Sequence, residues 1–230
     1  MKLSIIIPVF NEEKTIAQIV DKIIKAKVTT EIIIVNDAST DQTKNILTKI
    51  SKDKPVYHKV ILVHHNQNLG KGEAIKTGLA KTTGDFVLVQ DADLEYDPQD
   101  IPKLIKPVKD GKATVVFGSR FTGEHRNLFF WHMVANKTLT LLTNILFDTT
   151  LSDMETCYKL IPRKLLEDLN LKSKRFDFEP EVTAKILKRG IRIYEVPISY
   201  AGREYDEGKK IGPWDGFIAI WTLIKYRLLD

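Results

Sequence analysis

Apolar residues along the first half of the chain alternate between two spacings. Short runs rich in isoleucine and valine are typical of buried strands, and the segments between them repeat apolar residues every three or four positions, as amphipathic helices do. The runs that predict strands are residues 3–9, 31–36, 59–65, 85–90 and 113–119. This alternation predicts an α/β fold, Rossmann-like, with a mostly parallel sheet flanked by helices.

The alternation weakens after about residue 125, but the chain shows no linker composition. The pattern predicts helices at residues 129–147, 180–189 and 214–229, and short strands at 157–161 and 191–198. The last helix has a wide apolar side and is amphipathic. We therefore expect the second half to complete a single domain that covers residues 1–230.

Polar clusters follow the predicted strands. They are Phe10-Asn11-Glu12, Asn36-Asp37, Asn66 to Asn68, Asp91 to Glu95, and Ser119-Arg120. Because ligands of open parallel sheets bind at the carboxyl ends of the strands, these clusters predict one site built from several strand ends.

Composition and charge place only weak limits on the partners and the cellular location of the protein. The net charge of +5 fits an anionic substrate or a membrane surface, and scattered solvated lysines explain it equally well. No basic tract is interleaved with aromatic residues, which argues against nucleic acid, and no apolar run reaches the ~18–20 residues of a membrane span. The lone Cys157, expected to be a packed core thiol, excludes an internal disulfide and favours a cytoplasmic location.

The acidic stretch VLVQDADLEYDP (87–98) is the strongest chemical signal. If the strand continues, side chains two apart share one face, so Asp91, Asp93 and Glu95 can converge on one cation. Oxygen ligands alone suit Mg²⁺ or Mn²⁺. The alternative is a solvated acidic turn before a helix, and this is the interpretation we favour for Asp97 and Asp100.

Several motifs in order carry a family resemblance. IIIPVFNEE, IIIVNDASTD, NLGKGEAIKTG and the aspartates after the fourth strand together resemble the family 2 glycosyltransferases of the GT-A fold. In the second half, GSRF, DMETCYK, RFDFEPEVTAKILKRG, YEVPISYAGRE and EGKKIGPWDG resemble the polyprenyl-phosphate branch, typified by dolichyl-phosphate mannose synthases. The resemblance covers essentially the whole chain.

For the first half, residues 1–120, the resemblance implies binding of a nucleotide-diphospho-sugar. It assigns the nucleotide to Pro8, Phe10, Glu12 and Asp37. It assigns the metal on the diphosphate to Asp91 and Asp93, with Glu95 standing where relatives usually carry glutamine. Lys71 would neutralise phosphate, or else is an exposed lysine at a helix start.

For residues 121–230 the resemblance implies binding of a polyprenyl phosphate, dolichyl or undecaprenyl. A phosphate monoester is already ionised at neutral pH, so it needs cations rather than a general base. The cationic candidates are Arg120, Arg203 and Lys209, with Lys210 and Arg126 behind them. Asp153 matches a family aspartate near the reacting centre, where it would position the sugar or the cations.

The expected reaction is an inverting, metal-dependent transfer of a hexose from GDP-mannose or a UDP-sugar. Asp93, Arg120 and Asp153 are the expected catalytic residues. The wide apolar side of the helix at 214–229 has two interpretations: by default it packs in the protein's own core. Because the family acts on a membrane lipid, the resemblance implies instead that part of this helix or of residues 128–147 rests on the bilayer surface, at the cytoplasmic face, or on a membrane-protein partner. The alternatives are a family 2 transferase that acts on a sugar hydroxyl, although no Arg-Trp pair is present, and a non-catalytic sugar-nucleotide-binding subunit.

Overall fold

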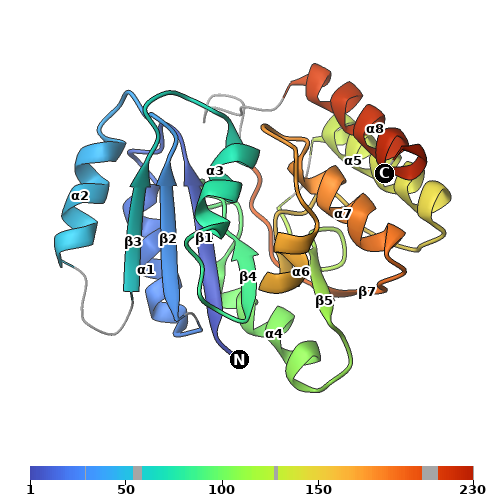
Figure 1. Ribbon diagram of the computed structural model, residues 1–230, viewed down its shortest axis with the longest axis horizontal. Coiled ribbons are helices and arrows are strands. Elements are labelled where there is room, and N and C mark those ends of the chain that lie inside the picture. Colours follow the sequence, from blue (N-terminus) through green and yellow to red (C-terminus); the bar gives the residue numbers. More distant parts are fainter. Residues whose placement is uncertain (29, 54–58, 127–128, 204–211, 230) are drawn as a thin grey trace.

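The computed structural model describes residues 1–28, 30–53, 59–126, 129–203 and 212–229 (Figure 1). The strands are β1 (Leu3–Val9), β2 (Glu31–Asn36), β3 (Lys59–His64), β4 (Phe86–Val89), β5 (Val115–Ser119), β6 (Lys159–Pro162) and β7 (Ile193–Pro197). The helices are α1 (Ile16–Ala26), α2 (Thr43–Asp53), α3 (Lys71–Leu79), η1 (Pro98–Asp100), α4 (Ile101–Lys109), α5 (Phe130–Phe147), α6 (Arg163–Asp168), α7 (Phe178–Lys188) and α8 (Pro213–Leu228).

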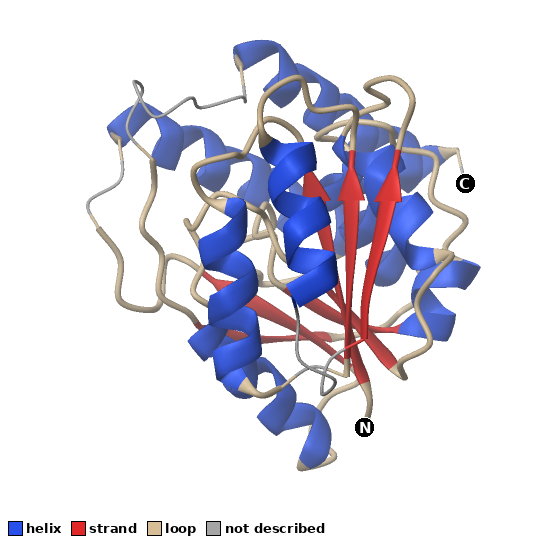
Figure 2. Ribbon diagram, turned by 90° about the vertical axis from the view of Figure 1, so that its left-hand side faces the viewer, coloured by secondary structure: helices blue, strands red, loops and turns tan. Residues whose placement is uncertain are grey.

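The strands form one sheet in the order β3-β2-β1-β4-β6-β5-β7, with helices on both sides of it (Figure 2). All the pairings are parallel except those of β6, which runs antiparallel to both β4 and β5. The predicted mostly parallel α/β sheet is therefore confirmed, and the same sheet joins the two halves of the chain. The predicted strand at 157–161 begins two residues later, because the chain first turns through Cys157 and Tyr158.

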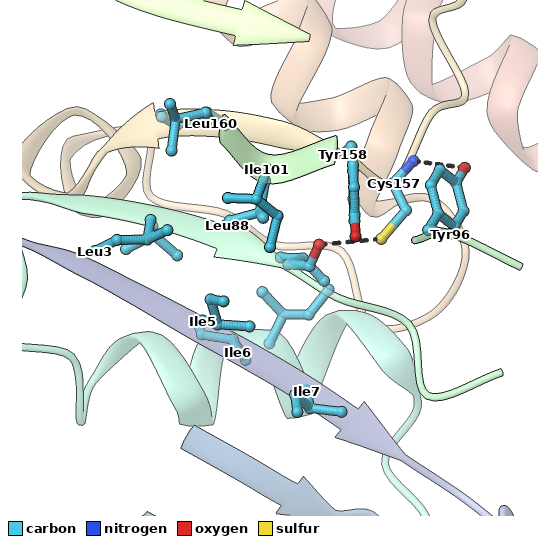
Figure 3. Packing of buried hydrophobic residues seen from close by; sticks show 14 of the residues in the cluster. Leu3, Ile5, Ile6, Ile7, Leu88, Tyr96, Ile101, Cys157, Tyr158 and Leu160 are labelled. Atoms are coloured by element: carbon cyan, nitrogen blue, oxygen red, sulfur yellow. Dashed lines mark hydrogen bonds between the residues drawn. The ribbon is translucent and has the colours of Figure 1, made fainter. Parts of the chain in front are cut away.

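The core lies where the apolar pattern is densest. The isoleucines of β1 and β2 are essentially inaccessible, and α1 buries Ile16, Ile19, Val20 and Ile23 against the sheet. Fully burying a side chain of this size stabilises the fold by about 1.5–3 kcal/mol relative to exposure. Figure 3 shows this packing around β1, where Cys157 lies beside Tyr96 and donates from its thiol to the Val89 carbonyl. The expectation of a packed core thiol is confirmed, and burial raises its pKa.

A second, smaller core joins α5, α7 and α8. Its buried members are Leu139, Met154, Ala184, Ala219, Leu223 and Tyr226. The helices α5 and α8 lie side by side at the end of the molecule opposite α2 (Figure 1). Their outer sides leave large apolar residues exposed, namely Phe130, Trp131, Leu141, Ile145, Trp214, Phe217 and Trp221. The described helices include none that is both long enough and apolar enough to cross a bilayer.

Candidate active site

The loops after β1 and β2 are joined by hydrogen bonds at the carboxyl edge of the sheet. The Asn11 amide N–H donates to Ser39 Oγ over 3.0 Å, and the Glu12 amide N–H donates to Thr43 Oγ1 over 2.9 Å. Pro8 and Phe10 lie half-buried at the end of β1 beside them. The predicted nucleotide-binding residues of the first strand are thus held at the expected edge, while their contact with a nucleotide stays a prediction.

Asp37 is almost completely buried, and both of its carboxylate oxygens have partners within the protein. One oxygen lies 2.7 Å from His65 Nδ1 and accepts from the Leu69 amide, and the other accepts from the Gly70 amide. Asp37 therefore fixes the loop that leads into α3. Its predicted contact with the base or ribose remains a prediction.

Lys71 points inward, so the alternative of an exposed lysine at a helix start is wrong. Its Nζ lies 2.8 Å from Asp91 Oδ1 and 2.8 Å from Glu179 Oε1. Burial alone would lower the pKa of Lys71, but the two carboxylates raise it well above its usual value. The turn before it needs glycine, because Gly70 has a φ of +95° and a Cβ there would collide with the Lys174 carbonyl.

The Asp-x-Asp segment is a turn rather than the continuation of a strand. β4 ends at Val89, and Leu94 adopts a left-handed φ of 64°, which a leucine rarely does outside constrained sites. The premise that successive side chains alternate here is therefore wrong. The turn sends Glu95 away to accept from the Tyr200 hydroxyl over 2.6 Å and from the Arg203 amide over 2.8 Å.

The carboxyl group of Asp93, at this turn, has an unusually high pKa. Burial, followed by the charges of Asp91 and Glu95, raises its pKa to about 7, and Arg203 opposes this only partly. A divalent cation would relieve such repulsion, so Asp91 and Asp93 fit as two oxygen ligands of Mg²⁺ or Mn²⁺. Within the described ranges no three acidic, histidine or cysteine residues form a ready metal cluster. Glu95 fits the role of third ligand less well, because its oxygens are already hydrogen-bonded.

Arg120 and Asp153, the two remaining predicted catalytic residues, form a buried ion pair. Arg120 Nε and Nη2 each donate to a different oxygen of Asp153 over 2.7 Å, and Nη2 also donates to Asn136 Oδ1 over 3.0 Å. Burial alone would lower the pKa of Arg120, and Asp153 raises it. Asp153 therefore orients the guanidinium group, which is one of the two positioning roles expected of it.

Arg203 reaches across the edge to the first strand. Its Nη1 and Nη2 donate to the two carboxylate oxygens of Glu12 over 3.1 Å and 2.7 Å, and its Nε donates to the Asp93 carbonyl over 3.2 Å. Two predicted substrate-binding residues that lie 191 positions apart are thus brought together. Arg126 also lies near, since its amide donates to the Tyr200 carbonyl. Lys209 and Lys210 fall outside the described residues.

Three residues of the site were missed by sequence reasoning. Glu179 holds Lys71, Tyr200 holds Glu95, and Glu195 accepts from the Ser152 amide over 2.8 Å and from the Asp153 amide over 3.2 Å. Each lies inside a motif that was recognised as a whole. A charged side chain within the apolar run of β7 was the available signal for Glu195.

The sequence matches a known family and several characterised proteins. The model of the Glycosyl transferase family 2 matches residues 4–169. The chain is 29% identical to a UDP-N-acetylglucosamine–dolichyl-phosphate N-acetylglucosaminyltransferase of Methanococcus voltae, over 97% of this chain and 95% of that protein. It is 27% identical to an undecaprenyl-phosphate 4-deoxy-4-formamido-L-arabinose transferase of Photorhabdus laumondii, over 90% of this chain and 62% of that protein. A low-salt glycan biosynthesis hexosyltransferase of Haloferax volcanii is also 27% identical, and the chain spans about half of its length, 53%.

Solved structures share the fold. Glucosyl-3-phosphoglycerate synthase from Mycobacterium tuberculosis, crystallised with Mn²⁺, UDP and glucosyl-3-phosphoglycerate, superposes with a TM-score of 0.74 at 23% identity. The match covers 100% of this chain and 81% of that one. A crystal of the same enzyme with Mg²⁺ and UDP gives a TM-score of 0.73 at 24% identity, covering 100% of this chain and 80% of that one.

Proposed function

The chain belongs to the Glycosyl transferase family 2, and from this membership we propose that it transfers a hexose from a nucleotide-diphospho-sugar to a polyprenyl phosphate. The observation that carries the proposal is that Arg203 meets Asp93, which lies beside Asp91, at one edge of the sheet. The carboxylates suit a metal-bound diphosphate, and the arginine suits a second phosphate. Two relatives named above act, by their names, on dolichyl or undecaprenyl phosphate.

On the donor side, Pro8, Phe10, Glu12 and Asp37 would hold the base and ribose at the end of β1 and β2. Asp91 and Asp93 would hold Mg²⁺ or Mn²⁺ against the diphosphate, as the metals found with UDP in the structural neighbours suggest. When bound, the metal ion neutralises the leaving diphosphate as a Lewis acid.

On the acceptor side, the nucleophile is a phosphate oxygen that is already ionised, so the site needs no general base. Arg120, oriented by Asp153, and Arg203 supply two guanidinium groups for the acceptor phosphate, which would take the place of part of their present carboxylate contacts. We assign Lys209 to the same phosphate from its motif alone. Attack from the face opposite the diphosphate would invert the anomeric carbon.

The exposed apolar residues of α5 and α8 support a membrane-associated site of action. Trp131 and Trp214 are 75% and 74% exposed, and an exposed apolar patch of this kind marks a site of interaction with a membrane or with another protein. A polyprenyl acceptor is itself embedded in the membrane. We therefore place the protein peripherally at the cytoplasmic face, where a membrane-protein partner is the alternative cover for these helices.

A donor panel tests the proposed reaction. Purified protein is incubated with GDP-mannose, UDP-glucose or UDP-N-acetylglucosamine, a polyprenyl phosphate and Mg²⁺ or Mn²⁺, and lipid-soluble product is measured. We expect product with one donor and none after metal chelation. Transfer only to a sugar hydroxyl would overturn the acceptor assignment, and nucleotide binding without transfer to any acceptor would indicate a non-catalytic subunit.

A further inference from the structure

Glu155 has a buried carboxylate oxygen with no hydrogen-bond partner. It lies in the loop between Asp153 and β6, and its Oε1 is one of only two such side-chain atoms in the described part of the chain, the other being Ser173 Oγ. The neighbouring Lys159 acts on Glu155 through its charge, while its Nζ donates to the carbonyls of Met154 and Thr156 over 2.6 Å and 2.7 Å rather than to Glu155 Oε1. These two bonds fix the backbone on both sides of Glu155.

Other buried carboxylates near the site are fully satisfied. Glu181 accepts from the amides of Lys172 and Ser173 and pairs with Lys185, and Asp153 accepts from Arg120. A buried polar atom without a partner is costly, and native structures hold few of them. The missing partner of Glu155 is therefore a specific feature, and a hydroxyl donor bound nearby would satisfy it.

The surroundings of Glu155 indicate which ligand. Glu155 follows Asp153 by two residues in the same loop, and the charges of Glu179, Lys159, Arg120 and Asp153 all act on its carboxylate. Arg120 and Asp153 belong to the proposed acceptor-phosphate side. Glu179 belongs to the donor side, because it holds Lys71 against Asp91. Glu155 is thus influenced by groups assigned to the diphosphate side and by groups assigned to the acceptor-phosphate side.

In a direct transfer the sugar lies between the leaving diphosphate and the attacking phosphate, so it would meet groups of both sides. We propose that Glu155 accepts a hydrogen bond from one hydroxyl of the donor sugar and so helps to determine which sugar is used. This inference rests on the proposed function. Hydroxyl recognition by a buried acceptor discriminates strongly, because a sugar without that hydroxyl leaves the buried Oε1 atom unpaired.

Binding of the donor tests this proposal without the acceptor. The probes are GDP-mannose, UDP-glucose and UDP-N-acetylglucosamine, each compared with GDP or UDP by calorimetry in the presence of Mn²⁺. We expect Glu155→Ala to weaken the preferred nucleotide sugar about tenfold, the loss of one buried hydrogen bond, and to leave the nucleoside diphosphate unchanged. Glu167→Ala, on the exposed side of α6, is the matched control and should change neither affinity.

Deoxy analogues of the preferred donor identify the hydroxyl. Removing one hydroxyl should weaken binding to the wild type about tenfold, and removing the same hydroxyl should have no effect in Glu155→Ala, as a double-mutant cycle requires. The proposal would be overturned if Glu155→Ala weakened binding of UDP and of the UDP-sugar equally. It would also be overturned if the effects of Glu155→Ala and of removing a hydroxyl were additive for every hydroxyl of the sugar. Glu155→Gln, which keeps the shape of the side chain, repeats the cycle should the alanine variant not fold.

The outcomes separate this proposal from the reaction on which it rests. Wild-type protein that binds a donor through Glu155 but makes no lipid product would leave the role of Glu155 intact and overturn the acceptor assignment. Wild-type protein that binds none of the nucleotide sugars would overturn both.

Discussion

The polar edge of the sheet and the exposed apolar residues of α5 and α8 differ in whether their side chains have partners within the protein. At the edge, charges pair with one another: Lys71 with Asp91 and Glu179, and Arg203 with Glu12. On the outer side of α5 and α8, Trp131 is 75% exposed and Trp221 is 61% exposed, with no cover from the described chain. The edge has internal partners for its charges, whereas the helices need an external partner for their apolar surface.

This difference determines how each surface can bind. A phosphate or nucleotide that reaches the edge must exchange with ion pairs already made, so part of its binding free energy replaces existing contacts. A bilayer that reaches α5 and α8 only adds contacts, because those side chains face water beforehand. Substitutions at the edge should therefore change specificity and rate, and substitutions on the helices should change location.

The largest loss of activity is expected on substitution of Asp93, a carboxylate of the polar edge that we assign to the metal. We expect Asp93→Ala to lower transfer by about 1,000-fold or more, because the metal-bound diphosphate loses a carboxylate, an effect of the size seen when one transition-state-stabilising group is removed. The initial rate of lipid-product formation measures it. The free energy of unfolding in urea should not fall, since the substitution removes a carboxylate that burial and its neighbours destabilise.

The control for Asp93→Ala is Asp97→Ala, four residues on. Asp97 caps η1 through the Gln99 amide and pairs with Lys22 at the surface. It should keep transfer within about threefold and lose about 1 kcal/mol of stability, as is typical for a helix cap. Equal activity in the two variants would mean that Asp93 does not bind the metal.

Arg203→Ala tests whether a ligand at the polar edge replaces ion pairs that are already formed. We expect kcat/KM for the acceptor to fall about 100-fold, because a guanidinium group that grips phosphate is lost. Affinity for the donor should stay equal or increase, since the nucleotide no longer competes with Arg203 for Glu12. Arg163→Ala, which breaks a surface pair with Glu167, is the matched control. A large loss of donor affinity would contradict the exchange.

The triple substitution Trp214→Ser, Phe217→Ser and Trp221→Ser tests whether the exposed apolar side chains of α8 add contacts with a bilayer. We expect partitioning onto vesicles of anionic phospholipid to fall at least tenfold, because about 25 cal/mol is lost for each Å² of apolar surface that no longer leaves water. Co-sedimentation measures it, and transfer to a short, water-soluble polyprenyl phosphate should be unchanged.

The matched control for the triple variant is Tyr194→Ser, an exposed aromatic residue that lies on β7 and not on α5 or α8. It should leave vesicle binding unchanged. Wild-type protein that does not bind protein-free vesicles at all would favour a membrane-protein partner over the bilayer.

Sequence reasoning succeeded where the determinants are local. The strands and helices of the first half follow from runs of apolar residues, and the strand-end clusters follow from parallel pairing. The antiparallel direction of β6 was not predictable, because periodicity carries no information about pairing direction. Lys71 and Arg203 were recognised as cations, but their partners Glu179 and Glu12 lie 108 and 191 positions away, and only the packed fold brings them together.

The smallest expected effect concerns Glu155, the one edge carboxylate whose Oε1 has no partner in the described chain. Burial, then the charge of Glu179, raises its pKa from 4.5 to about 7. Because the folded pKa is the higher one, the stability that this proton linkage gives is full below pH 4.5 and is lost as the pH rises through 7. Relative to Glu155→Gln, the wild type should therefore lose on the order of 1 kcal/mol between about pH 5.5 and about pH 8.

Urea unfolding of both proteins at the two pH values measures this difference directly. Glu167→Gln, a substitution at an exposed carboxylate on α6, is the control and should show no such divergence from the wild type. Parallel stability curves for the wild type and Glu155→Gln would mean that Glu155 is satisfied by water or by a neighbour, and the argument that it awaits a sugar hydroxyl would lose its energetic basis. Divergence that a bound donor sugar suppresses would instead show that the sugar interacts with the charge of Glu155, and would identify the sugar as the partner of its Oε1 atom.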